Sequence, residues 1–282
     1  MKEYYLDFVG MRIILRTPYE ITISESLRPF LCRGHNETDC IIRLERCHAL
    51  PAFTEDGVWH GSEYYDICHG AQRIFHCIAP SEAAFAVTEL FEDGNIRLSV
   101  LTDYLSYFTG TAGIFNRIGL ETLLLQHKGL LLHASLIKFE GKAIAFSGPS
   151  GVGKSTQADL WHTFFGAEIL NGDRAALRQK PEGWMAYGSP YAGTSGIYKN
   201  DGAPLAAIVL LEQGQENCIC RLSEMEAFRY IYQELSVHQW DKHYVATATD
   251  LCLQMLSEIP VYLLKCRPDA DAALLTKKGL GL

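Results

Sequence analysis

The stretch Gly148-Pro149-Ser150-Gly151-Val152-Gly153-Lys154-Ser155 decides the fold of the second half of the chain, because it matches the phosphate-binding pattern G-x-x-x-x-G-K-[ST] in full. The apolar run 143–146 precedes it as a predicted strand, and 155–165 follows as a predicted helix with Leu160 and Phe164 on one face. Glycines in such a loop let successive backbone N–H groups point at a phosphate, and the helix N-terminus adds partial positive charge. The pattern therefore predicts a bound nucleoside triphosphate.

Each residue type in this loop has a defined chemical task. Lys154 supplies a mobile positive charge to the β- and γ-phosphates, and the Ser155 hydroxyl is a ligand for Mg²⁺. We therefore expect ATP and Mg²⁺ as cofactors. The predicted nucleotide-binding residues are Gly148, Pro149, Ser150, Gly151, Val152, Gly153, Lys154, Ser155 and Thr156.

The alternation of apolar and polar residues along the rest of the chain predicts two domains. Residues 1–110 contain short alternating segments and turn clusters, with 74–78, 85–90 and 96–100 forming a predicted meander, so we expect a β-rich N-terminal domain. From Thr111 the pattern changes to strands that alternate with helices, which predicts an α/β domain with a partly parallel sheet over 111–282. The expected helices are 113–128, 155–165, 224–240 and 244–257, and the expected strands are 130–139, 143–146, 167–170, 205–211 and 261–265.

Composition limits the classes of partner. The 282 residues are 48% hydrophobic, and 25 Lys and Arg stand against 33 Asp and Glu, for a net charge of −8. Such a balance argues against a nucleic-acid binder that works through a basic surface. No apolar run approaches a membrane span and no secretory signal is evident, so we expect a cytoplasmic protein without a membrane partner. The nine cysteines are scattered and form no C-x-x-C pair, which is typical of free thiols in a reducing compartment. Histidines at 35, 48, 60, 69 and 76 fit no metal-ligand spacing.

Asp173 is the first candidate for chemistry outside the loop. It follows the predicted strand 167–170, in Asn171-Gly172-Asp173-Arg174. A carboxylate at the C-terminal end of a strand in an α/β sheet faces the same crevice as the phosphate loop. Two roles stay open: it holds Mg²⁺, or it accepts a proton from an incoming hydroxyl. The alternative is an ordinary turn aspartate, which Asn-Gly-Asp also favours.

A second acid, Glu212, follows the apolar run 208–211 and resembles a Walker-B acid. An Asp is expected at that position and no second acid follows, so we interpret Glu212 as an ordinary strand-end residue. No Leu-Ser-Gly-Gly-Gln motif is present, which disfavours a transporter-type ATPase.

Several residues near Asp173 have two interpretations each. Residues 187–196 combine three glycines with hydroxyl groups, and they form either a mobile loop over the phosphates or a plain surface loop. Lys199, just beyond, is a candidate for the γ-phosphate. Arg174 and Arg178 either stabilise transition-state charge or make structural ion pairs.

Three segments together resemble the catalytic domain of HPr kinase/phosphorylase, which is related to the phosphoenolpyruvate carboxykinase fold. They are Leu132-His133-Ala134-Ser135, the loop with its flanks (146–156), and Ile169-Leu170-Asn171-Gly172-Asp173-Arg174. The resemblance covers about residues 130–212 and extends more loosely to Leu282.

This resemblance implies catalytic roles for Asp173, Lys154 and His133, and metal binding by Ser155 and Asp173. His133 would hydrogen-bond a phosphate or Asp173, with a core histidine on a strand as the alternative. The family carries two aspartates in a row here, and the first of them is Gly172 in this chain, which leaves the identity of the proton acceptor open.

The function implied is transfer of the γ-phosphoryl group of ATP to a hydroxyl, most readily a serine of a peptide or protein, as in HPr kinase-like serine kinases, some of which modify peptides. The family's protein-substrate loop is not visible, so HPr itself is not expected as the substrate. The N-terminal domain is then a candidate for acceptor recognition. Two alternatives stay open: a nucleotide-dependent regulatory ATPase or switch, and a kinase for a small molecule such as an amino acid, sugar or nucleoside. The sequence leaves the oligomeric state open, a homo-oligomer included.

Overall fold

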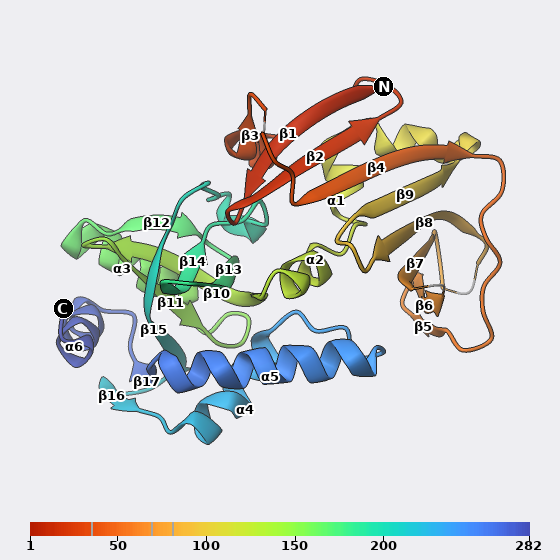
Figure 1. Cartoon of the computed structure of the whole chain (residues 1–282). Coiled ribbons are helices and arrows are strands. Elements are labelled where there is room, and N and C mark those ends of the chain that lie inside the picture. The colour runs from red at the N-terminus through yellow and green to blue at the C-terminus, as the bar shows by residue number, and fades with distance from the viewer. Residues whose placement is uncertain (35, 69, 81) are drawn as a thin grey trace. The chain divides into compact units, whose positions relative to one another are not determined.

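A computed structural model of the chain describes residues 1–34, 36–68, 70–80 and 82–282 (Figure 1). The chain divides into two compact units, Met1–Gln126 and His127–Leu282, each with its own sheet. Segment 111–126, which the sequence analysis assigned to the second domain, is thus part of the first unit. His35 and His69 lie outside the described residues. Among the described helices, none is long and apolar enough to cross a membrane.

The described part of the first unit is built on a nine-stranded mixed sheet in the order β3-β1-β2-β4-β9-β8-β7-β6-β5. Neighbours are antiparallel except β2–β4 and β4–β9, which are parallel. The predicted meander is confirmed as β7, β8 and β9. The strands are β1 (Lys2–Phe8), β2 (Met11–Thr17), β3 (Leu31–Cys32), β4 (Cys40–Cys47), β5 (Val58–His60), β6 (Glu63–Cys68), β7 (Ala71–Cys77), β8 (Ala84–Phe91) and β9 (Ile96–Leu101).

Short helices complete the first unit: the 3-10 helices η1 (Glu25–Phe30) and η2 (Thr102–Phe108), then α1 (Thr111–Phe115) and α2 (Leu120–Gln126). The single helix predicted over 113–128 is wrong, because the chain leaves the helical path between α1 and α2. α1 ends at Phe115, and Gly119, with φ +58°, turns the chain directly before α2 begins at Leu120. The apolar spacing that predicted one helix joined Ile114 of α1 and Ile118 of the connection to the buried leucines of α2.

The second unit contains the predicted strands and helices with a few differences. The hairpin β13–β14 and the edge strand β16 were not predicted, and α4 ends at Glu234 rather than Trp240. Leu235 is extended and bridges to Leu132, which stops that helix. The elements are β10 (Gly129–Phe139), β11 (Lys142–Ser147), α3 (Lys154–Phe165), β12 (Glu168–Asn171), β13 (Arg174–Lys180), β14 (Gly183–Tyr187), η3 (Gly193–Ser195), β15 (Gly202–Gln213), β16 (Cys218–Arg221), α4 (Glu224–Glu234), α5 (Lys242–Glu258), β17 (Val261–Cys266) and α6 (Ala270–Leu280).

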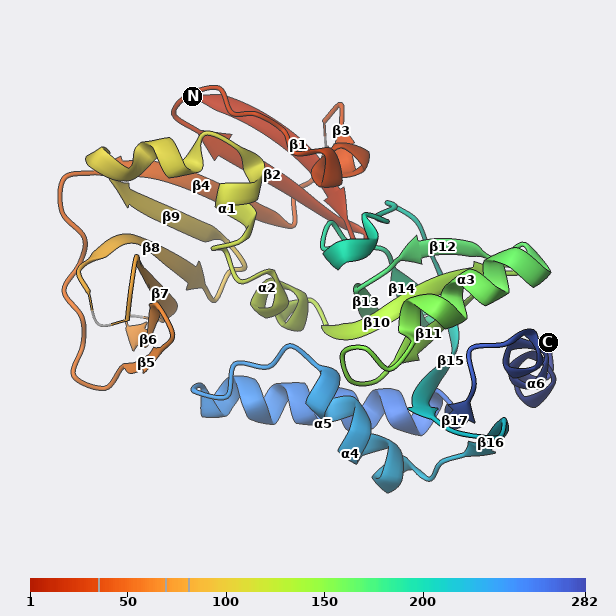
Figure 2. The same cartoon turned by 180° about the vertical axis from the view of Figure 1, so that it is seen from behind.

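Two long strands organise this unit. The first half of β10 pairs with β13 and its second half with β11 and β12. The start of β15 pairs with β14, whereas its later residues lie between the parallel strands β11 and β17. The mixed α/β class is therefore confirmed, with parallel pairing confined to β11–β15–β17 within this unit. The C-terminal ends of these three strands open toward the glycine-rich loop and the start of α3 (Figure 2).

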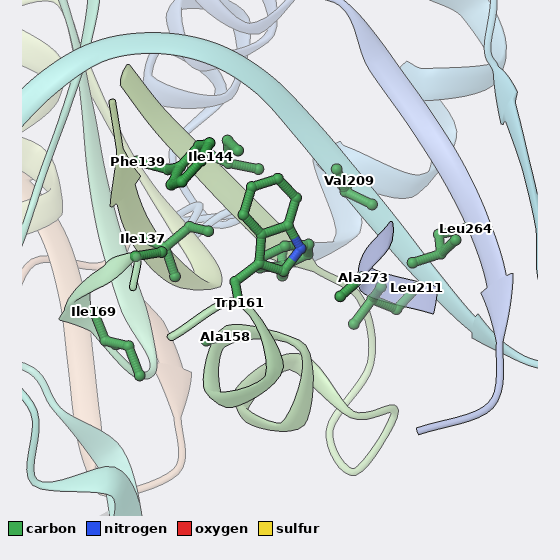
Figure 3. Packing of buried hydrophobic residues seen from close by; sticks show 12 residues of the cluster. Ile137, Phe139, Ile144, Ala158, Trp161, Ile169, Val209, Leu211, Leu264 and Ala273 are labelled. Atoms are coloured by element: carbon green, nitrogen blue, oxygen red, sulfur yellow. The ribbon is translucent and has the colours of Figure 1, made fainter. Parts of the chain in front are cut away.

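The core beneath the loop forms around Trp161 of α3. This indole is fully buried against Ile144 and Phe146 of β11 and against Val209 and Leu211 of β15 (Figure 3). Successive side chains of a strand point to opposite faces of the sheet. Leu210 of β15 and its partner Leu263 of β17 therefore lie on the other face of these strands, toward α4. The helix that follows the loop is thus held on one face of the parallel strands by a large aromatic side chain.

Candidate functional site

The glycine-rich loop 148–153 joins the end of β11 to the start of α3. Gly148, Gly151 and Gly153 have φ values of +138°, +79° and +113°, conformations that side chains with a Cβ rarely adopt. A Cβ on Gly148 would also lie 3.3 Å from the Leu211 carbonyl oxygen. Gly153 is the N-cap and offers no side chain, so no side-chain cap covers the first N–H groups of α3 in this described stretch. The loop therefore exposes backbone donors for an anion.

Lys154 is folded back over the loop. Its Nζ donates to the carbonyl oxygens of Gly148 at 2.8 Å and Pro149 at 3.1 Å, and the residue is 7% exposed. Burial lowers the pKa of Lys154, and the nearby carboxylates of Glu234 and Asp173 oppose that shift. The ammonium group is thus held inside the loop and within electrostatic range of two carboxylates.

Ser155 and Thr156, which were also predicted to contact the nucleotide, lie in the first turn of α3 and are both exposed.

Two cavities border the loop. One, of about 560 Å³, lies between the loop, the first turn of α3 and residues 213–215 and 266–268. The other, of about 580 Å³, lies between the loop, the ends of β15 and β17, and Tyr230, Gln233 and Glu234 of α4.

His133 lies between two carboxylates. Its Nδ1 is 2.8 Å from Oε2 of Glu234, and its Nε2 is 3.4 Å from Oδ1 of Asp173. All three side chains are partly buried, with side-chain exposures of 20% for His133, 13% for Glu234 and 32% for Asp173. The structure thus brings together His133 and Asp173, which the sequence analysis selected, and adds Glu234; Lys154 lies within electrostatic range of both carboxylates. We call His133, Asp173 and Glu234 the acidic cluster.

Sequence reasoning missed Glu234 for an identifiable reason. It stands 101 residues after His133, at the last position of α4, and no motif surrounds it. The helix itself is well marked, since Ser223 and Glu226 form a capping box at its start. The only sequence signal would have been an acid on the inner face near the end of this helix.

Asn171 sets the position of Asp173. The Asn171 side chain is fully buried, and its Oδ1 accepts hydrogen bonds from the backbone N–H groups of Asp173 and Arg174 at 2.8 and 2.7 Å. Its Nδ2 donates to the Ser189 carbonyl at 2.9 Å. The turn is also tied to β10, because Ala134 N donates to Asp173 O at 2.9 Å. These bonds fix the Asp173 backbone beside His133.

Gly172 has no room for a side chain unless Ser195 moves. A Cβ there would lie 2.0 Å from Oγ of Ser195 and 2.4 Å from its Cβ. The position at which the resembled family has its first aspartate is therefore occupied by the Ser195 side chain, so Asp173 is the carboxylate that this turn offers. The Ser195 hydroxyl donates to Ala192 O at 2.6 Å and accepts from Ile197 N at 3.2 Å.

Residues 187–196 pack closely on this turn. Ser189 is fully buried and donates to Arg174 O at 2.6 Å. A Cβ on Gly193 would lie 2.8 Å from Cγ of Asp173, so the loop passes directly over that carboxylate. The mobility expected of this loop stays a prediction, and its first residues are anchored.

Of the three other candidate cations, two lie in structural contacts away from Asp173 and one stays beside it. Lys199 pairs with Glu168 at 2.8 Å, at the opposite end of β12 from the Asp173 turn. Arg178 donates to His127 O at 3.0 Å. Arg174 remains at the site, with Nε 3.8 Å from Oδ2 of Asp173 and an Nη1 bond of 3.1 Å to Ser236 Oγ.

Glu212 is the ordinary strand-end acid that the sequence analysis preferred. It pairs with Lys265 at 2.9 Å across β15 and β17, and both side chains are about half exposed. The contact raises the pKa of Lys265 through the hydrogen bond. Such an exposed pair adds little to stability, because solvent screens the two charges.

The candidate site offers few oxygen ligands for Mg²⁺, but they are of the chemical type that Mg²⁺ binds. Among the described residues, no group of three or more His, Cys, Asp and Glu side chains has a geometry that would hold a metal ion. Mg²⁺ commonly keeps several waters and needs only one or two protein oxygens besides the phosphates. The exposed Ser155 hydroxyl and the Asp173 carboxylate meet that requirement in kind.

Comparison with known proteins does not assign this chain to a family. A scan against protein-family models found no match for this chain, and a search of curated proteins found none either.

Proposed function

We propose that this chain is an ATP- and Mg²⁺-dependent kinase of the HPr kinase-like type, which transfers the γ-phosphoryl group to a hydroxyl, in the first place a serine of a peptide or protein. The observation that carries the proposal is the position of Lys154. The lysine of a phosphate-binding loop lies within electrostatic range of Asp173 and Glu234, and His133 stands between these carboxylates.

The loop would bind the triphosphate. The uncapped N–H groups at the start of α3 and the backbone of 148–153 would offer partial positive charge to the β-phosphate. Lys154 would exchange its bonds to the Gly148 and Pro149 carbonyls for the β- and γ-phosphate oxygens. Because a carbonyl oxygen is a weaker partner for an ammonium than a phosphate, this exchange favours binding.

Asp173 would accept the proton of the acceptor hydroxyl. The hydroxyl oxygen forms a bond to the γ-phosphorus while the bond from that phosphorus to the β–γ bridging oxygen breaks, and ADP leaves with the electron pair. His133 faces Asp173 through Nε2, and Glu234 holds the ring through Nδ1. The imidazole therefore positions the base, and Arg174 adds positive charge at the same carboxylate.

Mg²⁺, when bound, would neutralise charge on the β- and γ-phosphates. Ser155 and Asp173 are the residues that would hold it. Asp173 cannot be a close metal ligand and a free base at the same time, so the Asp173→Asn variant separates the roles. Loss of turnover with nucleotide binding retained supports the base, whereas loss of Mg²⁺-dependent nucleotide affinity supports the metal ligand.

The decisive experiment follows label from γ-³²P-ATP. The purified protein is incubated with Mg²⁺ and an extract of its own host, and label is traced in protein, peptide and small-molecule fractions. Lys154→Ala should abolish transfer with the fold retained. Lys199→Ala is the matched control, since its side chain pairs with Glu168 away from the site.

The outcomes separate the alternatives. Label in a protein or peptide supports the proposal, and label in a small molecule indicates the third class of function instead. Label only in free phosphate, at a rate raised by a partner, would indicate a regulatory ATPase. Transfer that survives Lys154→Ala in a clean preparation would overturn the proposed function.

A further inference from the structure

The cavity on the α3 side of the glycine-rich loop has the size and position of a ligand site. It measures about 560 Å³, within the range of roughly 300–1,000 Å³ found for small-molecule pockets. One wall is formed by 151–153 and Thr156, and the other by 213–215 and 266–268. A ligand in this cavity would therefore touch the loop itself at one end.

The charge of this cavity differs from that of its neighbour. Among the described residues no Asp or Glu lines it, and Arg267 is its only fully charged side chain. The cavity on the α4 side is lined by Glu212 and Glu234. Since the nucleoside of a triphosphate is joined to the anionic α-phosphate, carboxylates beside it are unfavourable and a neutral or cationic wall is favourable.

The floor of the cavity holds an incompletely paired amide. Gln157 is 2% exposed, its Nε2 donates to Cys266 Sγ at 3.4 Å, and its Oε1 has no hydrogen-bond partner although it is buried. A buried carbonyl oxygen without a partner is costly, and a donor such as an exocyclic amino group would relieve that cost. Arg267 also lines the cavity and is half exposed; its Nε pairs with Asp269 Oδ2 at 3.0 Å, which holds in place a planar guanidinium on which a base can stack.

We propose that this α3-side cavity receives the base and ribose of the nucleoside triphosphate, with Gln157 as a hydrogen-bond acceptor and Arg267 as a stacking surface. The inference rests on the proposed function, because it assumes that the triphosphate occupies the loop. It leaves the acid-lined cavity to the acceptor side of the reaction, where Glu234 holds His133.

Cys266 provides a built-in probe of occupancy. Its side chain lines the cavity and is partly buried, and burial raises the pKa of its thiol, so N-ethylmaleimide should modify it slowly and measurably near pH 8.5. Modification is followed by peptide mass spectrometry, with the exposed Cys218 on β16 as the internal control. At about ten times the Kd, ATP should slow Cys266 modification roughly tenfold. Inorganic tripolyphosphate, which has no nucleoside, should leave Cys266 reactive.

Binding measured by calorimetry separates the ways in which this can fail. If neither ATP nor tripolyphosphate binds, the proposed function itself fails. If tripolyphosphate binds as tightly as ATP, or protects Cys266 equally well, the loop holds phosphates and the cavity does not hold the nucleoside. If ATP binds tightly and Cys266 stays fully reactive, the nucleoside lies elsewhere and the inference is overturned.

A pair of charge substitutions tests the same assignment without the thiol. Gln215 and Gln233 are both exposed, and each lines one of the two cavities. Gln215→Glu puts a carboxylate beside the nucleoside and the α-phosphate, so it should weaken ATP binding about five- to tenfold. Gln233→Glu adds the same charge on the α4 side and should leave ATP affinity within about twofold. The opposite ranking would assign the nucleoside to the acid-lined cavity.

Discussion

Gly172 packs tightly against the Ser195 side chain at the candidate site. This packing allows a prediction that does not depend on the proposed function. Gly172→Ala would put a Cβ 2.0 Å from Ser195 Oγ and 2.4 Å from its Cβ, separations that real atoms do not tolerate. Ser195 cannot rotate away freely, because its hydroxyl bonds to Ala192 O and Ile197 N. We expect the substitution to strain both the Asp173 turn and loop 187–196.

The expected cost is that of an overpacked site, about 1–3 kcal/mol of unfolding free energy. For a unit of this size about 1 kcal/mol corresponds to roughly 2–4 °C in Tm, so a cost near 2 kcal/mol lowers the Tm by about 4–8 °C. Ser195→Gly removes the clashing atoms but also two hydrogen bonds, and should cost on its own about 1 kcal/mol.

The double variant decides between a local clash and a general loss. If Gly172 and Ser195 are as close as in the structure, the double variant Gly172→Ala with Ser195→Gly should lose less unfolding free energy than the two single variants lose in total. The difference should be about 1 kcal/mol or more. Thermal unfolding followed by tryptophan fluorescence is suitable, because Trp161 and Trp184 are buried in the second unit. Additive single effects would refute the reasoning, and so would an unchanged Tm for Gly172→Ala.

Two further predictions follow from the acidic cluster and the buried thiols. Glu234→Gln should lower phosphoryl transfer by roughly 10–100-fold with ATP affinity retained, since it loosens the His133 ring. Glu168→Gln is the matched control, because Glu168 pairs with Lys199 away from the site, and equal effects of the two variants would contradict the positioning role. Burial raises the pKa of Cys252 to about 12 from an ordinary value of 9.0, so above pH 9 the unfolded chain loses its proton first. The stability that this thiol contributes is complete below pH 9 and falls as the pH rises toward 12, by at most about 1.4 kcal/mol per pH unit. Denaturant unfolding at pH 8 and 10 should show this slope in the parent chain and less of it in Cys252→Ala; an identical slope would contradict the assignment.

Local patterns were sufficient for much of the second unit. The strand before the loop, the helix after it and the closing strand β17 lie close to their predicted positions, because apolar periodicity and glycine spacing act within a few residues. The hairpin β13–β14 escaped prediction, since β13 mixes Arg, Gln and Lys with small residues and β14 is only five residues long. The broken helix at Gly119 shows the opposite error, in which apolar spacing continued across a turn.

The candidate site was predictable only in part. Lys154 belongs to a contiguous motif, and Asp173 follows a strand directly, so both could be selected from the chain alone. His133 acquired a defined environment only in the folded structure, between Asp173 and Glu234. The Mg²⁺ and nucleotide assignments stay predictions that the labelling and binding experiments test.

What the sequence by itself determined is the phosphate-binding pattern and its strand–loop–helix frame, because backbone conformation at glycines and the periodicity of a helix depend on neighbouring residues. Only the tertiary structure decided that Glu234 reaches His133 from 101 residues away and that Ser195 excludes a side chain at Gly172. Such contacts join segments distant in the chain, and their energies depend on ångström-scale separations that no local pattern encodes. The chemistry of the site arises where those distant segments meet.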